Sequence, residues 1–245
     1  MNTYPAPLSP DALRQRLLDR ASAPYRASGK FGYHFARGKL GGDPMFLALL
    51  QRGLIPDRSR ILDLGCGQGL LAAWLLAARQ VFDAGEWPAG WPAPAQVAEI
   101  RGVDMLASDI KRASKALAAP ARFELGDMRE ADFGQTDVVV IMDVLHYVDR
   151  AAQQDVLCRV RDALPAGGLL LTRVGDARAG WGFRLSNWVD RTVAFFRGNR
   201  LPPLHCRPLT DWVASLEALG FRVESTPMNG DLPFANVMLV ARLDG

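Results

Sequence analysis

Apolar and polar positions follow two alternating patterns from residue 60 onward. Short apolar runs predict five strands, at 60–64, 98–103, 121–125, 137–142 and 168–174. Apolar residues spaced three and four apart predict helices between them, at 69–79, 108–118 and 150–164. Runs such as Val138–Ile141 are apolar on both faces, as in a parallel sheet covered by helices on both sides. The pattern indicates a doubly wound α/β fold.

The segments before residue 60 are patterned differently. Ser9 and Pro10 precede leucines at helical spacing, so a capped helix is predicted there. Residues 22–42 are rich in glycine and aromatic residues, which predicts an irregular approach segment. Asp43 and Pro44 then begin a short helix that is predicted to run to about Arg52.

The segments after residue 175 complete the organisation. A helix is predicted from Thr210 to Leu219, followed by strands at 221–226 and 236–243. Two stretches interrupt the regular alternation, a Trp/Pro/Gly-rich insertion at 82–96 and a second insertion at 175–209. We therefore divide the chain into an N-terminal helical and aromatic cap segment, 1–42, and one larger domain, 43–245, that carries both insertions.

Composition excludes several classes of protein. With 245 residues, 49% hydrophobic and 22% charged, the chain has the balance of a globular domain. The run Leu70–Ala78 is too short to span a membrane, and no secretory signal is visible. Cysteines at 66, 158 and 206 are too widely spaced to suggest a disulfide framework or a zinc site. A cytoplasmic protein is expected, and the net charge of +3 does not argue for nucleic acid.

The first strand runs directly into three alternating glycines, Gly65, Gly67 and Gly69. Glycines allow positive φ angles and let backbone approach a ligand closely. A dinucleotide-binding turn needs G-x-G-x-x-G, and its third glycine would fall at position 70, which is a leucine. Leu70 therefore opposes an NAD-dependent oxidoreductase.

The remaining pattern, Asp63-x-Gly65-x-Gly67-x-Gly69, resembles motif I of the class I S-adenosylmethionine (SAM) methyltransferases. The resemblance implies SAM as cofactor and a doubly wound, seven-stranded, mostly parallel sheet with an antiparallel last strand and helical cap insertions. It also implies that Asp63 binds the ammonium of SAM, and that Cys66 lies with the glycines at the cofactor.

Acidic residues at later strand ends extend the resemblance. Asp104, followed by Met105, is expected at the ribose, with Asp109 as the alternative acid. Asp127 is expected to accept from the adenine amino group, with the backbone N–H of Met128 beside it. Asp143 follows the fourth strand, where family members line the passage from SAM to the methyl acceptor.

The sequence offers three histidines as candidate catalytic bases, His34, His146 and His205, without ranking them. Each of the three is also compatible with a surface or packing role. No metal is expected, because the Asp-Asn pair of a catechol-type magnesium site is missing. The absence of a [DNS]-P-P-[YF] motif after the fourth strand disfavours methylation of exocyclic base amines or glutamine.

A methyltransferase acting on a small apolar or aromatic acceptor is the leading interpretation. The alternative is a non-catalytic or regulatory SAM-binding protein of the same fold. Residues 178–207 carry six arginines and one aspartate, around an amphipathic pattern. This basic segment is interpreted as a packed cap helix, as the roof of an acceptor pocket, or as a docking site for an acyl carrier protein or an anionic membrane surface.

Overall fold

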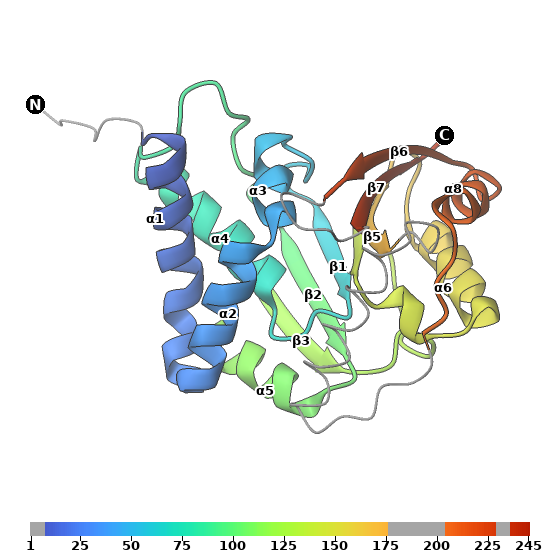
Figure 1. Cartoon of the computed structure of the whole chain (residues 1–245), viewed down its shortest axis with the longest axis horizontal. Coiled ribbons are helices and arrows are strands. Elements are labelled where there is room, and N and C mark those ends of the chain that lie inside the picture. Colours follow the sequence, from blue (N-terminus) through green and yellow to red (C-terminus); the bar gives the residue numbers. More distant parts are fainter. Residues whose placement is uncertain (1–7, 176–203, 229–235) are drawn as a thin grey trace, which may run out of the picture. The chain divides into compact units, whose positions relative to one another are not determined.

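The computed structural model describes residues 8–175, 204–228 and 236–245. The chain divides into two compact units, Met1–Asp127 and Met128–Gly245 (Figure 1). The strands form one seven-stranded sheet in the order β3-β2-β1-β4-β5-β7-β6. This order and the antiparallel last strand confirm the predicted fold class.

The first unit combines N-terminal helices with the first three strands. Its elements are α1 (Pro10–Ser22), η1 (Ala23–Ser28), α2 (Lys30–Gly42), α3 (Pro44–Gln51), β1 (Arg60–Leu64), α4 (Leu70–Asp83), β2 (Glu99–Asp104), α5 (Ala107–Ala116) and β3 (Ala121–Leu125). The three strands pair in parallel, β1 with β2 and β2 with β3. The predicted strands and helices of this part are confirmed, with α4 extending four residues beyond the predicted end.

The prediction of an irregular segment at 22–42 was wrong, because most of it is helical. Helix α2 buries Gly32, Ala36 and Leu40, which are spaced four residues apart on one face. A Cβ at Gly32 would lie 3.3 Å from the Cβ of Ser28, so the small residue lets the chain pack closely. Tertiary packing on this narrow face outweighs the low helix propensity of the four glycines in α2.

The insertion at 82–96 is ordered by contacts with the helices of its own unit. The indole N–H of Trp87 donates to the carbonyl of Pro92 at 3.0 Å. The carboxylate of Glu86 lies 3.2 Å from Arg16 and 3.8 Å from Arg20, both on α1. The first two residues of the predicted insertion, Phe82 and Asp83, belong to α4.

The second unit contains the remaining strands. Its described elements are β4 (Val138–Met142), η2 (Leu145–Tyr147), α6 (Arg150–Ala163), β5 (Leu169–Gly175), α8 (Leu209–Glu217), β6 (Phe221–Pro227) and β7 (Asn236–Leu243). Strand β4 pairs with β5 in parallel, and β7 runs antiparallel to both β5 and β6. The apolar runs Val138–Ile141 and Leu169–Leu171 are fully buried, as the pattern predicted. Most of the predicted insertion at 175–209, residues 176–203, lies outside the described residues.

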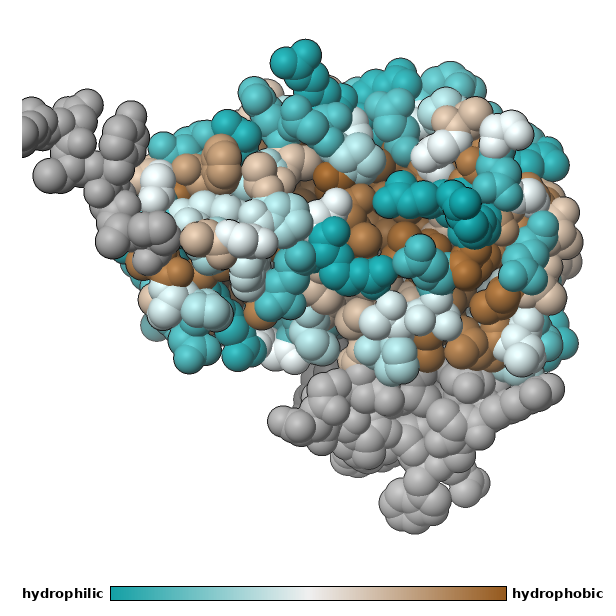
Figure 2. All heavy atoms as spheres, turned by 90° about the horizontal axis from the view of Figure 1, so that it is seen from above, coloured by the Kyte–Doolittle hydropathy of each residue, from teal (hydrophilic) through white to brown (hydrophobic). Residues whose placement is uncertain are grey.

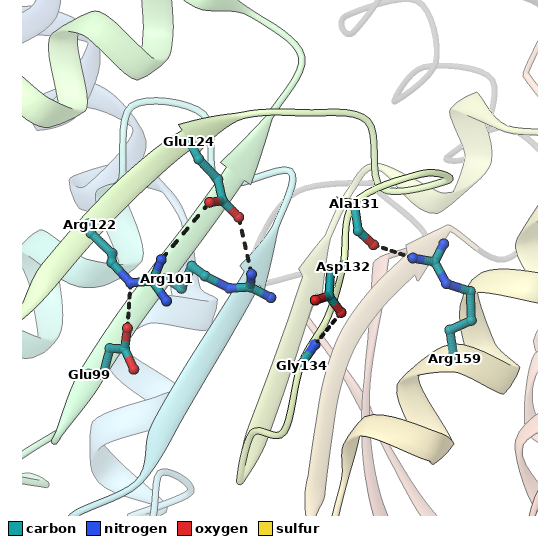
Figure 3. A network of polar contacts seen from close by, with 8 residues as sticks. All are labelled: Glu99, Arg101, Arg122, Glu124, Ala131, Asp132, Gly134 and Arg159. Carbon is teal, nitrogen blue, oxygen red and sulfur yellow. Dashed lines mark hydrogen bonds and ion pairs between the residues drawn. The ribbon is translucent and has the colours of Figure 1, made fainter.

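One face of β2 and β3 carries charged rather than apolar side chains. Arg122 binds Glu99 and Glu124, and Glu124 also binds Arg101 (Figure 3). These four residues alternate along the two strands and therefore share one face. The connection at 126–137, which lies entirely within the described part, contains no helix. A ladder of ion pairs thus forms a solvated face where a doubly wound fold often places a helix.

Hydrophilic residues cover much of the face shown in Figure 2, with hydrophobic residues exposed between them. Within residues 8–175, 204–228 and 236–245, no helix has the length and apolar character that crossing a membrane requires.

Candidate functional site

The turn after β1 is held against the end of β2 by backbone hydrogen bonds. The N–H groups of Gly65 and Cys66 donate to the carbonyl of Val103 at 2.8 and 3.2 Å. The three glycines of the turn all have left-handed φ angles, 77° at Gly65, 53° at Gly67 and 73° at Gly69. The sequence therefore needs glycine at these positions to form the turn.

Two of these glycines have different surroundings. A Cβ at Gly69 would lie 2.6 Å from the ring of Phe123, so this glycine is required for packing against β3. A Cβ at Gly67 would meet no atom within 4 Å. The backbone at Gly67 therefore borders open space that a ligand can occupy.

Asp104, the last residue of β2, is hydrogen-bonded to the same turn. Its Oδ2 accepts from the N–H of Gly67 at 2.9 Å, and its Oδ1 accepts from the N–H of Leu106 at 2.8 Å. These two contacts fix the carboxylate against the turn. The alternative acid, Asp109, is buried and pairs with Arg112 at 2.8 Å within α5. The structure thus brings Asp104, rather than Asp109, against the glycine turn.

Asp63 is a buried carboxyl group at the end of β1, with 5% of its surface exposed. Burial, together with the negative charge of Asp104, raises the pKa of Asp63 to about 7. Among the described residues, no cation and no hydrogen-bond donor pairs with its side chain. A buried carboxylate of this kind fits a cationic ligand group, such as the ammonium of SAM.

Gln68 and Tyr25 are two residues of this region that the sequence reasoning missed. The hydroxyl of Tyr25, from η1, donates to the backbone carbonyl of Gln68 at 2.6 Å. The Gln68 side chain is 1% exposed, and neither its Oε1 nor its Nε2 has a hydrogen-bond partner in the described part of the chain. The only sequence signal was a polar residue between two turn glycines, which gives no information about burial.

Apolar side chains are exposed at the ends of two strands in this unit. Met105, which follows β2, and Leu125, which ends β3, are each 60% exposed. Asp127 comes two residues after Leu125, and the N–H of the intervening Gly126 donates to the carbonyl of Asp104 at 3.0 Å. The end of β3 is therefore tied to the end of β2.

In the second unit, a buried arginine orients Asp143. Asp143 has a left-handed φ of 58°, which is uncommon for a residue other than glycine. Arg173, on β5 and almost fully buried, donates from Nε to Asp143 Oδ1 at 2.7 Å and from Nη2 to Oδ2. Arg173 was not predicted as a site residue from the sequence, because an arginine within an apolar strand gives no indication of its partner.

Arg159 holds the loop that begins at Met128. From α6, its guanidinium donates to the carbonyls of Met128 at 3.1 Å and Arg129 at 2.8 Å, and to that of Ala131 (Figure 3). The cation also lies 4.1 Å from the ring centroid of Phe133. The backbone of Met128, expected at the adenine ring, is thereby fixed from the helix side.

The three candidate histidines have different environments. His34 is exposed on α2, where its ring contacts Tyr33. His146 lies in η2, and burial lowers the pKa of its imidazole, against the raising influence of Asp143. Its Nε2 is buried and has no hydrogen-bond partner among the described residues. His205 is joined to His146 through its backbone, N–H to carbonyl, at 2.8 Å.

The described part of the chain contains no group of three or more His, Cys, Asp or Glu side chains that could hold a metal ion. Cys66, Cys158 and Cys206 form no disulfide within the described part of the chain. Burial, together with the nearby Asp63 and Asp104, raises the pKa of the Cys66 thiol. The protonated thiol is therefore the favoured form of Cys66.

Comparison with known proteins identifies relatives of this fold. A family model described as a methyltransferase domain matches residues 33–226. Human N-acetylserotonin methyltransferase, solved in complex with SAM, is 17% identical with a TM-score of 0.60, over 93% of this chain and 59% of that chain. An O-methyltransferase family protein from Burkholderia thailandensis is 19% identical with a TM-score of 0.61, over 90% of this chain and 62% of that chain.

A third solved structure is matched over nearly the whole of its own length. A SAM-dependent methyltransferase from Mesorhizobium loti is 20% identical with a TM-score of 0.55, over 78% of this chain and 95% of that chain. No functionally curated protein matches the sequence. At these identities the solved structures show the fold, whereas the family model covers most of the chain.

Proposed function

Because the chain belongs to the methyltransferase-domain family, whose methyl donor is SAM, we propose that it transfers a methyl group to a small apolar or aromatic acceptor. The observation that carries the proposal is the buried, unpaired carboxyl group of Asp63 beside a glycine turn open at Gly67. When bound, SAM supplies a sulfonium methyl that is already activated for transfer. The chain's own residues then need to bind SAM, orient the acceptor and remove the acceptor's proton.

Residues at the ends of the strands account for binding. Asp63 neutralises the ammonium, the bare backbone at Gly67 admits the ligand, and Asp104 accepts from the ribose hydroxyls. Asp127 and Met128 recognise the adenine edge, and the exposed apolar side chains of Met105 and Leu125 offer contact to its ring. Because the turn, Asp63 and Asp104 are fixed by backbone pairing, little ordering is left for the moment of binding.

His146 is the residue that we assign as general base. A neutral imidazole whose Nε2 accepts a proton suits an acceptor that loses a hydrogen on methylation, such as a hydroxyl or an N–H group. The O–H or N–H bond breaks as the acceptor atom bonds to the methyl carbon, the proton moves to Nε2, and S-adenosylhomocysteine leaves. The lowered pKa of His146 keeps this imidazole neutral at neutral pH. We assign no proton transfer to His34 or His205.

The test joins binding to turnover. Calorimetry with SAM, S-adenosylhomocysteine and NAD should show binding of the first two only. A panel of small phenolic, aliphatic hydroxyl and amine acceptors, read by release of S-adenosylhomocysteine, should identify at least one substrate, and His146→Gln should abolish its turnover while leaving SAM affinity unchanged. SAM binding with no acceptor turned over anywhere in the panel would instead favour a non-catalytic SAM-binding protein.

We also propose that the acceptor can be presented by an acyl carrier protein or an anionic membrane surface, through the basic segment 178–207. The support is its excess of arginine over acidic residues. Arg184→Glu combined with Arg191→Glu should weaken capture of acyl carrier protein or anionic vesicles and leave methylation of a free acceptor unchanged. Equal capture by the wild type and this variant would remove the docking proposal.

A further inference from the structure

Gln153 connects three separate backbone positions in the second unit. It lies on α6 and is fully buried. Its Nε2 lies within donating distance of three carbonyls, those of Leu145 at 3.0 Å, Val148 at 3.0 Å and His205 at 2.8 Å. The first two carbonyls flank His146, and the third belongs to the chain that re-enters the described part at residue 204. One carboxamide thus joins the loop after β4 to the segment before α8.

Arg207 completes the connection from the other side. Its Nε donates to Gln153 Oε1 at 2.5 Å, its Nη2 to the carbonyl of Arg150 at 2.7 Å, and its Nη1 to the hydroxyl of Ser215 at 3.2 Å. The guanidinium also lies 4.9 Å from the ring centroid of Trp212. Burial and the nearby Arg150 lower the pKa of Arg207, against the raising influence of Asp211. The stability of a buried cation of this kind depends on the geometry of each of its contacts.

His146 lies within the backbone that this pair of side chains holds. Its carbonyl accepts from the N–H of His205 at 2.8 Å, and its ring centroid is 4.3 Å from that of Tyr147. The 3-10 helix η2 has only three residues and no side-chain cap, so it supplies little hydrogen bonding of its own. The backbone that carries the imidazole is therefore held largely by hydrogen bonds to residues outside η2.

We propose that Gln153 and Arg207 form a positioning clamp that fixes the His146 loop and the 204–207 segment in the single arrangement that aims His146 Nε2 at the acceptor. The clamp rests on the proposed role of His146 as general base. Neither clamp residue acts on the acceptor itself; both act through backbone that they hold. Loss of the clamp should loosen the imidazole and admit water to it, with no direct effect on the glycine turn in the first unit.

Gln153→Glu separates the two halves of the clamp. A carboxylate keeps an acceptor for Arg207, so the buried cation stays paired, but it loses the donors to Leu145, Val148 and His205. We expect a folded protein in which the pKa of His146 rises toward the ordinary histidine value of about 6.5. Turnover should fall at least about tenfold, a loss of about 1.4 kcal/mol in transition-state stabilisation, while SAM affinity changes by less than about twofold.

Histidine NMR makes this test direct, because the chain has only three histidines and each resonance can be assigned with a His→Gln variant. Gln154→Glu is the matched control, since its side chain donates to Cys158 on the same helix and, within the described residues, makes no hydrogen bond to the loop after β4. The control should leave both the His146 titration and turnover unchanged. If the His146 titration and turnover in Gln153→Glu both match the wild type, the clamp has no positioning role.

A second variant covers the case in which Gln153→Glu does not fold. Arg207→Lys keeps the charge but cannot reach Gln153, Arg150 and Ser215 together. It should also raise the pKa of His146 and lower turnover, and an unchanged His146 titration in this variant would overturn the proposal. The titration needs no substrate, so it decides the clamp even if no acceptor is methylated. Failure to methylate any acceptor counts instead against the proposed function.

Discussion

Binding of SAM should depend on pH through Asp63. This carboxyl group is buried, and its pKa is raised to about 7, first because burial penalises the charge and second because Asp104 lies nearby. Pairing with the ammonium of SAM requires the ionised carboxylate. The ligand's own amino group, with an ordinary pKa of about 8, stays charged at and below neutral pH. Affinity should therefore rise as pH rises toward 7.

The magnitude follows from the fraction of protein that is ionised before binding. With a pKa of about 7, half of the free protein is ionised at pH 7 and only about 3% at pH 5.5. The dissociation constant for SAM should consequently be about 16-fold higher at pH 5.5 than at pH 7. Close to one proton should leave Asp63 for each SAM bound at the lower pH, and about half a proton at the higher pH.

Titration calorimetry in two buffers of different ionisation enthalpy measures both quantities. Asp63→Asn should bind SAM weakly and lose both the pH dependence and the proton release that belong to this group. Asp109→Asn is the matched control, because Asp109 is equally buried but paired with Arg112. A wild-type dissociation constant that stays level between pH 5.5 and pH 7, with no proton released, would refute the pairing of Asp63 with SAM.

The same group should limit stability in the free protein. An acid whose pKa is raised on folding binds its proton more tightly in the native state, so the free energy of unfolding falls as pH rises from about 4 to about 7. The full linkage from the ordinary value to about 7 is at most about 4 kcal/mol. Thermal denaturation should show Asp63→Asn more stable than the wild type at pH 8, with a difference that disappears near pH 4.

Two further predictions concern the turn. Asp104→Asn should weaken SAM binding by about 1–3 kcal/mol in calorimetry, because an amide replaces the carboxylate that accepts from the Gly67 N–H and is proposed to accept from the ribose. Asp109→Asn should leave SAM binding unchanged. Equal losses in the two variants would reject the assignment of Asp104 to the ribose. Gly69→Ala should lower the free energy of unfolding by about 2–4 kcal/mol in denaturant titrations, since its Cβ would clash with Phe123. Gly67→Ala should lower it by only about 1 kcal/mol, from backbone strain alone. Similar losses in the two variants would contradict the different surroundings of the two glycines.

The sequence identified the parts of the molecule that local pattern governs. Strands β1 and β3 have the predicted bounds, and the turn lies where three alternating glycines follow an apolar strand. Asp104 could be preferred over Asp109 because parallel strands bring their carboxyl ends to one edge of a sheet. The apolar pattern of the strands and the alternation of the glycines extend over only a few residues, so a short window of sequence specifies them.

The tertiary structure decided what depends on residues far apart in the chain. Residues 30–42 are helical despite their glycines because Gly32, Ala36 and Leu40 make a narrow face for packing. Gln68 is buried although nothing in its neighbourhood of sequence requires it.

The clamp has the same origin. Gln153 meets Arg207 across 54 residues, and a carboxamide on a helix is as suited to solvent as to a buried network. The sequence therefore determined the fold and the methyl donor, because both are encoded in strand ends and turn glycines. The tertiary structure alone decides which polar side chains are desolvated and need hydrogen-bond partners. Desolvation depends on all the neighbours of a side chain, and these come from distant segments of the chain.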